Sequence, residues 1–246
     1  MEYCQEIISG KRCHIFTRGE QGPVIYWGIA AGSGPMAEKT VRMLADADGG
    51  DFLLAVYEAE NWNRDFSPWP QAGVREGEHF EGGAPDILAW LLESCIPYVE
   101  GRFSQKPAVR MAAGYSLAGL FALWAYLESG QFAGAASISG SLWYPGWTEL
   151  LREKVKTANL SCRDGEDCIY LSLGRKEEKT RNPRMAAVGD ATRATERIFR
   201  EQASLKQLIL EWNPGGHFTE PERRMARGLD WLLKTQVKKE EVQNDH

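Results

Sequence analysis

The sequence contains no long apolar run and no leader-like start. No stretch of its 246 residues approaches the roughly 18 apolar residues that a membrane-spanning helix needs. The first residues, Met1 to Glu6, lack the basic and then apolar regions of a secretory signal. These absences predict a protein of the cytoplasm without a membrane partner.

The cysteines form no pattern that indicates a metal site or a disulfide framework. They are five in number, which leaves one over from any full set of pairs, and they share no close ligand spacing. We therefore expect reduced thiols. One alternative is a bridge between Cys162 and Cys168, which would close a short loop in an exported protein. Because the chain also lacks a pair of histidines or a His-Glu spacing suited to zinc, no metal is expected.

Charge of one sign is not concentrated in any part of the chain. The net charge is -5, and lysine and arginine are interspersed with acids, which argues against a nucleic-acid partner. Hydrophobic residues make up 43% of the chain and charged residues 26%, as in globular proteins. The length predicts a single domain over residues 1–236, followed by a polar tail, 237–246, that frays into solvent. The oligomeric state is left open, with a homodimer among the alternatives.

Short apolar runs alternate with helical patterns along the chain. This alternation is typical of a largely parallel β-sheet covered by helices. The first two runs, Gln5 to Ser9 and Arg12 to Thr17, are separated by Gly10-Lys11 and predict an antiparallel hairpin at the sheet edge. Further strands are predicted at Val24 to Trp27, Phe52 to Tyr57, Val109 to Ala113, Ala135 to Ile138, Ile169 to Leu173 and Gln207 to Glu211. Helices are predicted at Met36 to Ala45, Asp86 to Val99, Leu117 to Glu128, Ala187 to Ser204 and Glu220 to Lys234.

One predicted strand runs directly into a turn of small residues that contains a serine. Gly114-Tyr115-Ser116-Leu117-Ala118-Gly119 follows the strand and opens a helix that is apolar nearly all round. A nucleophile elbow needs this context, because small residues must flank the serine for the strained turn to close. Glycine is commoner than alanine at the position of Ala118, and the bare pattern can arise by chance in an ordinary Gly-Ser turn. The strand and the buried helix around it predict Ser116 as the nucleophile of an α/β-hydrolase fold.

Few histidines are available to activate this serine. A serine hydroxyl needs a base with a pKa near the working pH, and imidazole is the usual one. Of the four histidines, His246 ends the polar tail, His14 lies in an edge-strand pattern and His79 lies in a charged loop before the serine. His217 follows the last predicted strand, behind two glycines that allow its loop to approach the serine. We therefore predict His217 as the base.

A carboxylate that orients the imidazole should lie between the serine and the histidine in chain order. The predicted strand Ile169 to Leu173 ends in this interval and is followed by a turn at Gly174. Glu177 is the predicted acid, because a side chain just beyond that turn can return to the sheet edge. Glu178 and Asp190 are the alternatives.

Acyl transfer also needs backbone donors for the oxyanion. The residue after the nucleophile, Leu117, supplies the first, and the loop after an early strand usually supplies the second. We predict the amide of Ile29, which follows Gly28 in a run of small residues. The alternative is an ordinary glycine-rich connection between a strand and a helix.

Taken together, these segments resemble a known family, the putative esterases related to esterase D, the feruloyl esterases and the enterochelin esterases. The resemblance spans most of the chain and implies ester hydrolysis, a mechanism without a cofactor and a three-layer α/β/α sandwich. Similar members often carry histidine where Trp27 stands and glycine where Ala118 stands. Some siderophore esterases of the group work with a serine-histidine pair, so a site without an acid is a further alternative. The resemblance is carried by Val24 to Gly28, Asn61 to Pro70, Gly114 to Gly119, Leu173 to Glu178 and Gly216-His217.

The substrate is predicted only as a small-molecule ester, cleaved through an acyl-enzyme intermediate. An acyltransferase or a thioesterase would use the same Ser116 and His217, and a noncatalytic binding relative is the remaining alternative. Buried packing is the alternative role for each aromatic side chain near the site. The predicted pocket residues are Trp62, Arg64, Trp69, Tyr115 and Trp143, with Tyr144 beside the last of them.

Overall fold

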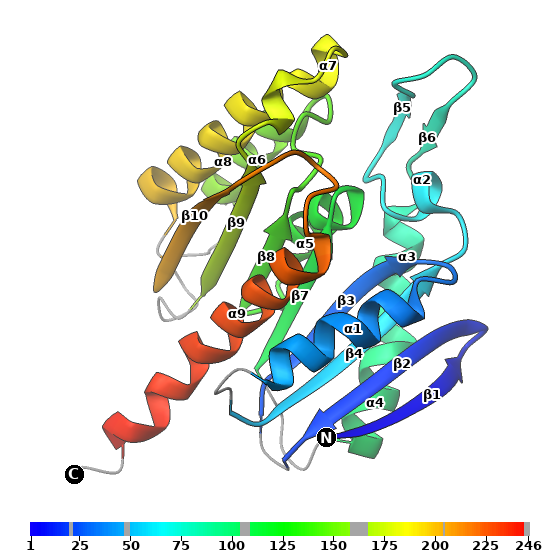
Figure 1. The fold of residues 1–246 in the computed structure, drawn as a ribbon, viewed down its shortest axis with the longest axis vertical. Coiled ribbons are helices and arrows are strands. Elements are labelled where there is room, and N and C mark those ends of the chain that lie inside the picture. Colours follow the sequence, from blue (N-terminus) through cyan, green and yellow to red (C-terminus); the bar gives the residue numbers. More distant parts are fainter. Residues whose placement is uncertain (20–21, 47–49, 104–108, 158–166, 204, 244–246) are drawn as a thin grey trace.

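An eight-stranded sheet forms the middle layer of the fold (Figure 1). The structure is a computed structural model, and it describes residues 1–19, 22–46, 50–103, 109–157, 167–203 and 205–243. The strands follow the order β1-β2-β4-β3-β7-β8-β9-β10. β4, β8 and β9 are buried along their whole length and β3 nearly so, as expected for strands covered on both faces. Their bounds are β1 Glu2–Ile8, β2 Lys11–Arg18, β3 Val24–Ala30, β4 Phe52–Ala59, β7 Arg110–Tyr115, β8 Gly134–Ile138, β9 Cys168–Gly174 and β10 Gln207–Asn213.

The strand directions confirm a largely parallel sheet with an antiparallel hairpin at one edge. β1 and β2 pair antiparallel, and their two-residue turn places Ser9 and Gly10 at φ 44° and 86°, as the twist of a tight hairpin requires. β2 is antiparallel to β4, whereas β4, β3, β7, β8, β9 and β10 all run parallel. The carboxyl ends of six strands therefore meet at one edge, where ligands bind in sheets of this kind.

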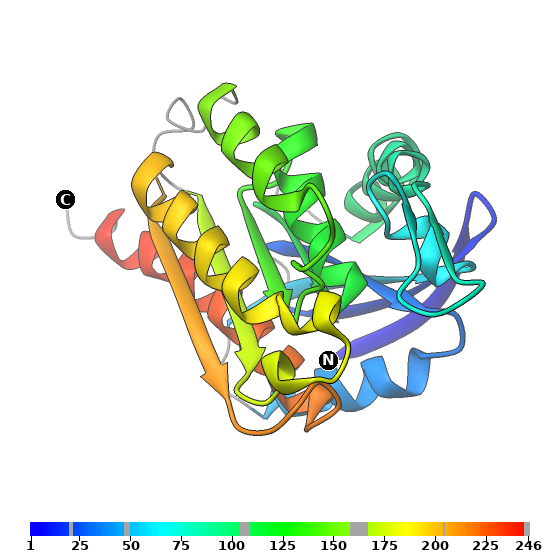
Figure 2. The same ribbon diagram turned by 90° about the horizontal axis from the view of Figure 1, so that it is seen from above.

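Helices cover both faces of this sheet, which confirms the three-layer sandwich (Figure 2). Alternate residues of β3 face opposite layers: Tyr26 packs on one side, and Ile25 and Trp27 pack on the other. One layer consists of α1 Gly34–Ala45 and α9 Pro221–Gln243. The other layer consists of α3 Ala84–Trp90, the π-helical turn η1 Leu91–Cys95, α4 Ile96–Phe103, α5 Leu117–Ser129, α6 Trp147–Thr157 and α8 Val188–Gln202.

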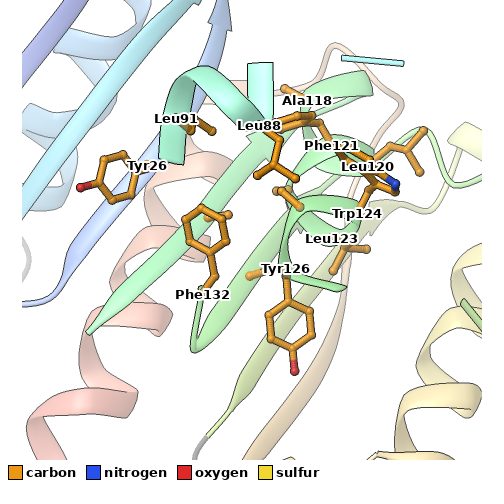
Figure 3. Packing of buried hydrophobic residues seen from close by; sticks show 14 of the residues in the cluster. Tyr26, Leu88, Leu91, Ala118, Leu120, Phe121, Leu123, Trp124, Tyr126 and Phe132 are labelled. Atoms are coloured by element: carbon orange, nitrogen blue, oxygen red, sulfur yellow. The ribbon is translucent and has the colours of Figure 1, made fainter. Parts of the chain in front are cut away.

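Helix α5 is the central helix of the larger core (Figure 3). Every residue from Leu117 to Leu127 is buried, which agrees with a helix that is apolar on all sides. Gly130, at φ 66°, ends the helix in the left-handed conformation that glycine adopts most easily. The first turn of α5 is therefore packed in the core directly after the end of β7.

Several short elements were not predicted, because they are too short to show a periodicity in sequence. They include a small antiparallel hairpin that stands apart from the main sheet in Figure 1. The predicted helix Asp86 to Val99 is interrupted by the turn η1, and α6 was also missed. The short elements are α2 Trp62–Asp65, β5 Pro70–Ala72, β6 His79–Glu81, η3 Glu177–Lys179 and α7 Pro183–Ala186.

Two expectations about the chain ends and the cysteines stay predictions. Helix α9 continues to Gln243, so residues 237–243 of the predicted tail are helical in the structure, and fraying in solution is untested. Cys162 lies outside the described residues, so the alternative bridge between Cys162 and Cys168 stays a prediction. Among the residues that are described, no helix is both long and apolar enough to cross a membrane.

Candidate active site

The serine predicted as nucleophile lies in a strained turn between β7 and α5. Ser116 has φ 58° and ψ -123°, a conformation that non-glycine residues rarely adopt. Its amide donates to the carbonyl of Ile138 on β8 at 3.0 Å, which holds the turn against the neighbouring strand. A Cβ atom on Gly114 would stand 2.1 Å from the carbonyl oxygen of Ala118. The turn therefore closes only with glycine at 114, whereas the methyl group of Ala118 is accommodated in the core.

The close approach at Gly114 gives a stability prediction. We expect Gly114→Ala to lower the free energy of unfolding by about 3 kcal/mol, because the added methyl overlaps backbone atoms that cannot move independently. Urea unfolding at pH 7 measures this change. Gly101→Ala is the matched control: its Cβ meets no atom within 4 Å in helix α4, so we expect a gain of up to about 1 kcal/mol. Equal stability of Gly114→Ala and the wild-type protein would contradict the elbow geometry.

His217 lies within hydrogen-bonding distance of the serine. Its Nε2 atom is 3.0 Å from Ser116 Oγ, and its Nδ1 atom is 2.7 Å from Glu177 Oε2. The hydroxyl of Tyr115 donates to the His217 carbonyl, and the two rings meet edge to face with centroids 5.4 Å apart. Ser116, His217 and Glu177 are thus joined in one chain of hydrogen bonds, although 101 and 40 residues of sequence separate His217 from its two partners.

Glu177 reaches His217 because the loops after β9 and β10 are bonded to each other. The amides of Arg175 and Lys176 donate to the carbonyls of Asn213 and Gly215, both at 2.9 Å. The Glu177 side chain is only 4% exposed. Its Oε1 atom accepts hydrogen bonds from the Gly174 amide at 2.7 Å, from Ser139 Oγ at 2.8 Å and from Arg224 Nη1 at 3.2 Å.

These contacts keep the carboxylate of Glu177 ionised. Burial on its own raises the pKa of Glu177, but the hydrogen bond and charge of His217 and the bonds from Ser139 and the Gly174 amide outweigh it. The net result is a pKa below the ordinary value for glutamate. A buried carboxylate in this state can orient the imidazole through Nδ1 and stabilise its charged form.

The alternative acids and bases lie elsewhere in the structure. Glu178 and Asp190 both bind Arg193, at 2.7 and 2.9 Å. His79 is exposed on β6. His14 is on β2, the second strand from the edge, and it is buried because β4 pairs on its far side.

Backbone amides suited to an oxyanion lie beside Ser116. Leu117 is the first residue of α5, so its amide is among those that have no acceptor within the helix. On β3, the amide of Val24 donates to Val109 on the β7 side, and that of Ala31 donates to Ala59 on the β4 side. Because successive strand amides alternate in direction, the amide of Ile29 faces β4 and that of Ala30 faces the side of β7. Pairing of β3 with β7 ends at Gly28, so the next amide on that side is that of Ala30.

A cavity of about 490 Å³ opens onto the serine and the histidine. Its walls come from the end of β3, the start of α1, the segment from α2 to β6, the loop after β8, α7 and the loop before α9. Most of its lining is apolar or aromatic, as in pockets for small organic ligands. The side chains that line it include Trp27, Met36, Trp62, Phe80, Trp143, Met185, Phe218 and Met225.

Three of the predicted pocket residues line this cavity: Trp62, Tyr115 and Trp143. The other two, Arg64 and Trp69, do not line it. The guanidinium of Arg64 is held by ion pairs with Asp65 and Asp86.

The indole of Trp69 does not line the cavity either, because it donates to the Pro145 carbonyl at 3.0 Å and packs edge to face on Tyr144. Tyr144 is itself buried and donates to the Trp69 carbonyl at 2.6 Å. These two residues fix the base of the loop after β8.

Other residues of the site carry no signal in the sequence. Phe218 follows His217, lines the cavity and is 88% exposed, and its ring meets that of His217 edge to face. Ser141 places its Oγ atom 3.4 Å from that of Ser116. Arg224 on α9 donates hydrogen bonds to Glu177 and to the carbonyl of Pro214. Within the described part of the chain, no group of histidine, cysteine and acidic residues could hold a metal ion.

Comparison with known proteins identifies similar chains. The family described as "Putative esterase" matches residues 14–220. No curated protein matches the sequence.

Among solved structures, an IroE-like serine hydrolase from Shewanella oneidensis is similar at TM-score 0.78 and 16% identity, over 95% of this chain and 80% of that one. The siderophore hydrolase EstA from Aspergillus nidulans is similar at TM-score 0.73 and 16% identity, over 96% and 94%. An enterochelin esterase from Shigella flexneri is similar at TM-score 0.65 and 20% identity, over 96% of this chain and 58% of that one. At these identities the likeness shows the fold.

Proposed function

The chain belongs to the Putative esterase family of carboxylic ester hydrolases, and we propose that it cleaves its substrate with Ser116 as nucleophile, His217 as base and Glu177 as acid. The observation that carries this proposal is the continuous chain of hydrogen bonds from Ser116 Oγ through His217 to Glu177, at 3.0 and 2.7 Å. The family supports ester hydrolysis, and the geometry supports these roles. A cytoplasmic location stays a prediction.

The proposed reaction begins when Ser116 Oγ attacks the ester carbonyl and its proton passes to His217 Nε2. The Nδ1 proton of the resulting imidazolium stays on its hydrogen bond to the ionised Glu177. The tetrahedral intermediate then collapses, and the alcohol leaves with the proton from Nε2. Water attacks the acyl-enzyme in the same way, its proton passes to Nε2, and the second collapse releases the acid and returns the proton to Ser116.

Two backbone amides are proposed to stabilise the oxyanion. Leu117, at the start of α5, is the first, with the positive end of the helix dipole behind it. For the second, the strand alternation favours Ala30 over the predicted Ile29, because only the Ala30 amide is directed toward the side of β7. The pocket residues Trp62, Tyr115 and Trp143 are proposed to contact the substrate.

A fluorophosphonate tests the nucleophile directly. We expect wild-type protein to gain one phosphonyl mass on the peptide that contains Ser116, and Ser116→Ala to gain none. Intact-protein and peptide mass spectrometry measure both results. Failure of the wild-type protein to label, or equal labelling of the variant, would sink the assignment.

A substrate panel would then define the ester. The solved structures that are similar include siderophore hydrolases, an enterochelin esterase and a ferulic acid esterase, but their identities to this chain are low. We therefore propose a small-molecule ester as the substrate class. p-Nitrophenyl esters of increasing acyl length, together with feruloyl, acetyl-sugar and catecholate siderophore esters, give the relevant comparison of kcat/KM.

A further inference from the structure

A second histidine and a second glutamate meet in the interior behind the site. His14 on β2 and Glu58 near the end of β4 are 4% and 6% exposed, and His14 Nε2 lies 3.0 Å from Glu58 Oε1. The other ring nitrogen, Nδ1, lies 3.0 Å from the hydroxyl of Tyr3 on β1. A neutral ring that donates from Nε2 to the carboxylate and accepts from Tyr3 at Nδ1 satisfies all three groups.

The carboxylate of Glu58 also holds the chain segment after β3. Its Oε2 atom accepts the backbone amide of Gly32 at 3.1 Å and lies 3.6 Å from Arg12 Nη1. Burial on its own raises the pKa of Glu58, but the bonds from His14 and from the Gly32 amide outweigh it and lower the pKa, so the group is an anion. Gly32 has φ 78°, and an anionic acceptor fixes its amide in this left-handed turn.

The same cluster packs against the start of α1. A Cβ atom on Gly34 would come within 2.6 Å of His14 Cε1, so the imidazole lies directly against the first residue of the helix. The amide of Ala31 is bonded to Ala59 and that of Ser33 to Ala30, at 3.0 and 3.1 Å. The segment from Ala30 to Gly34 is therefore held by a hydrogen bond to β4, by the carboxylate of Glu58 and by the imidazole of His14.

This segment forms the wall of the cavity beside Ser116. Ile29, Ala30 and Ser33 line the cavity, whereas Tyr3, His14 and Glu58 do not. A buried ionised carboxylate is costly to keep, and an apolar pair would fill the same space at lower cost. Its contact is with the amide of Gly32, two residues after Ala30, whose own amide is directed toward the side of β7.

We infer that Tyr3, His14 and Glu58 are positioning residues, which fix the Ala30 to Gly34 segment so that its backbone amide meets the oxyanion formed at Ser116. The inference rests on the proposed function, because it assigns the second oxyanion donor to this segment. An amide that is misplaced by about 1 Å can cost up to a hundredfold in rate, without direct contact between the altered residue and the substrate.

The experiment uses His14→Phe and Glu58→Gln in the full chain. We expect both to lower kcat by about tenfold to a hundredfold with KM nearly unchanged. The inhibition constant of a trifluoromethyl ketone, which forms a charged tetrahedral adduct with the serine, should rise by the same factor. His14→Gln, which can still donate to Glu58 and accept from Tyr3, should recover much of the loss.

The control is a carboxylate of similar burial that lies far from the site. Glu100 binds Arg110 and Tyr26, and its side chain is 13% exposed. Glu100→Gln should lower the melting temperature but leave kcat and the inhibition constant unchanged. A merely structural role of His14 and Glu58 would give that same pattern and would overturn the inference.

Two further results keep the test decisive. If His14→Phe and Glu58→Gln do not fold, Tyr3→Phe decides, because it keeps the ring that stacks on Phe16 at 4.9 Å and removes only the hydroxyl. A severalfold fall in kcat at constant KM then supports the inference, and wild-type values overturn it. Failure of a fluorophosphonate to label Ser116 in the wild-type protein would instead overturn the proposed function itself.

Discussion

Ser116→Ala is expected to lower kcat/KM for p-nitrophenyl acetate by about 10⁵-fold or more, to the level left by binding and the oxyanion donors alone. The alanine cannot form the acyl-enzyme, although the strained turn and the cavity persist around it. His217→Gln should lower kcat/KM by nearly the same factor, because no base then lies within hydrogen-bonding distance of the Ser116 hydroxyl. The residues act as a unit, so the double variant should be no slower than the slower single variant.

The matched control is a serine at the other end of the same helix. Ser129 donates its hydroxyl to the Ala125 carbonyl at 2.7 Å, far along α5 from the nucleophile. Ser129→Ala should keep kcat/KM within about twofold, since Ser129 does not line the cavity and substitutions away from such a site change little. Activity of Ser116→Ala above about 1% of the wild-type value, after correction for contaminating esterase, would contradict the nucleophile assignment.

Glu177→Gln should lower kcat by about 10² to 10⁴-fold. The amide has nearly the same volume, but it carries no charge to stabilise the imidazolium of His217 and can present an N-H group where Nδ1-H needs an acceptor. Steady-state kinetics at saturating ester measure the loss. Glu178→Gln is the control, because that carboxylate binds Arg193 and should leave kcat unchanged. A loss below about threefold for Glu177→Gln would favour a pair of Ser116 and His217 without an acid.

The same substitution has a pH-dependent effect on stability. The folded protein lowers the pKa of Glu177 from its ordinary value of 4.5, so the ionised form contributes stability above that pH. The contribution is lost as the pH falls through the lowered value. Urea unfolding of the wild-type protein and of Glu177→Gln should therefore differ most near neutral pH and converge in acid. A constant difference across this range would show that the charge is not responsible.

The sequence selected Ser116, His217 and Glu177, which the structure joins by hydrogen bonds, because each followed a strong local pattern. The run from Val109 to Gly119 shows a strand, a turn and a helix without interruption, and Gly215-Gly216 placed His217 on a loop after the last strand. The requirement that the acid lie between Ser116 and His217 in the chain reduced the candidates to a few carboxylates. The structure then brings Glu177, and neither Glu178 nor Asp190, to His217 Nδ1.

What could not be predicted depends on contacts between distant segments. Arg64 and Trp69 lie in an aromatic stretch beside the cavity, but Asp86 and Pro145 hold their side chains elsewhere. His14 sits in a pattern typical of an exposed edge strand, but Tyr3, Glu58 and the start of α1 bury its ring in the structure. The choice of Ile29 as the second oxyanion donor depended on its position along β3. A shift of one residue, to Ala30, reverses the direction of the backbone amide.

The contact of Arg224 with the acid has a consequence for how the protein is made. Chains emerge from the ribosome with their N-terminal part first, and the nucleophile turn can form once β7, β8 and α5 are available. The loop that carries Glu177 is held by Arg224, which also binds the Pro214 carbonyl from helix α9. The contacts that hold Glu177 are therefore complete only after helix α9 docks, and we expect the proposed activity toward esters to appear at that stage of folding.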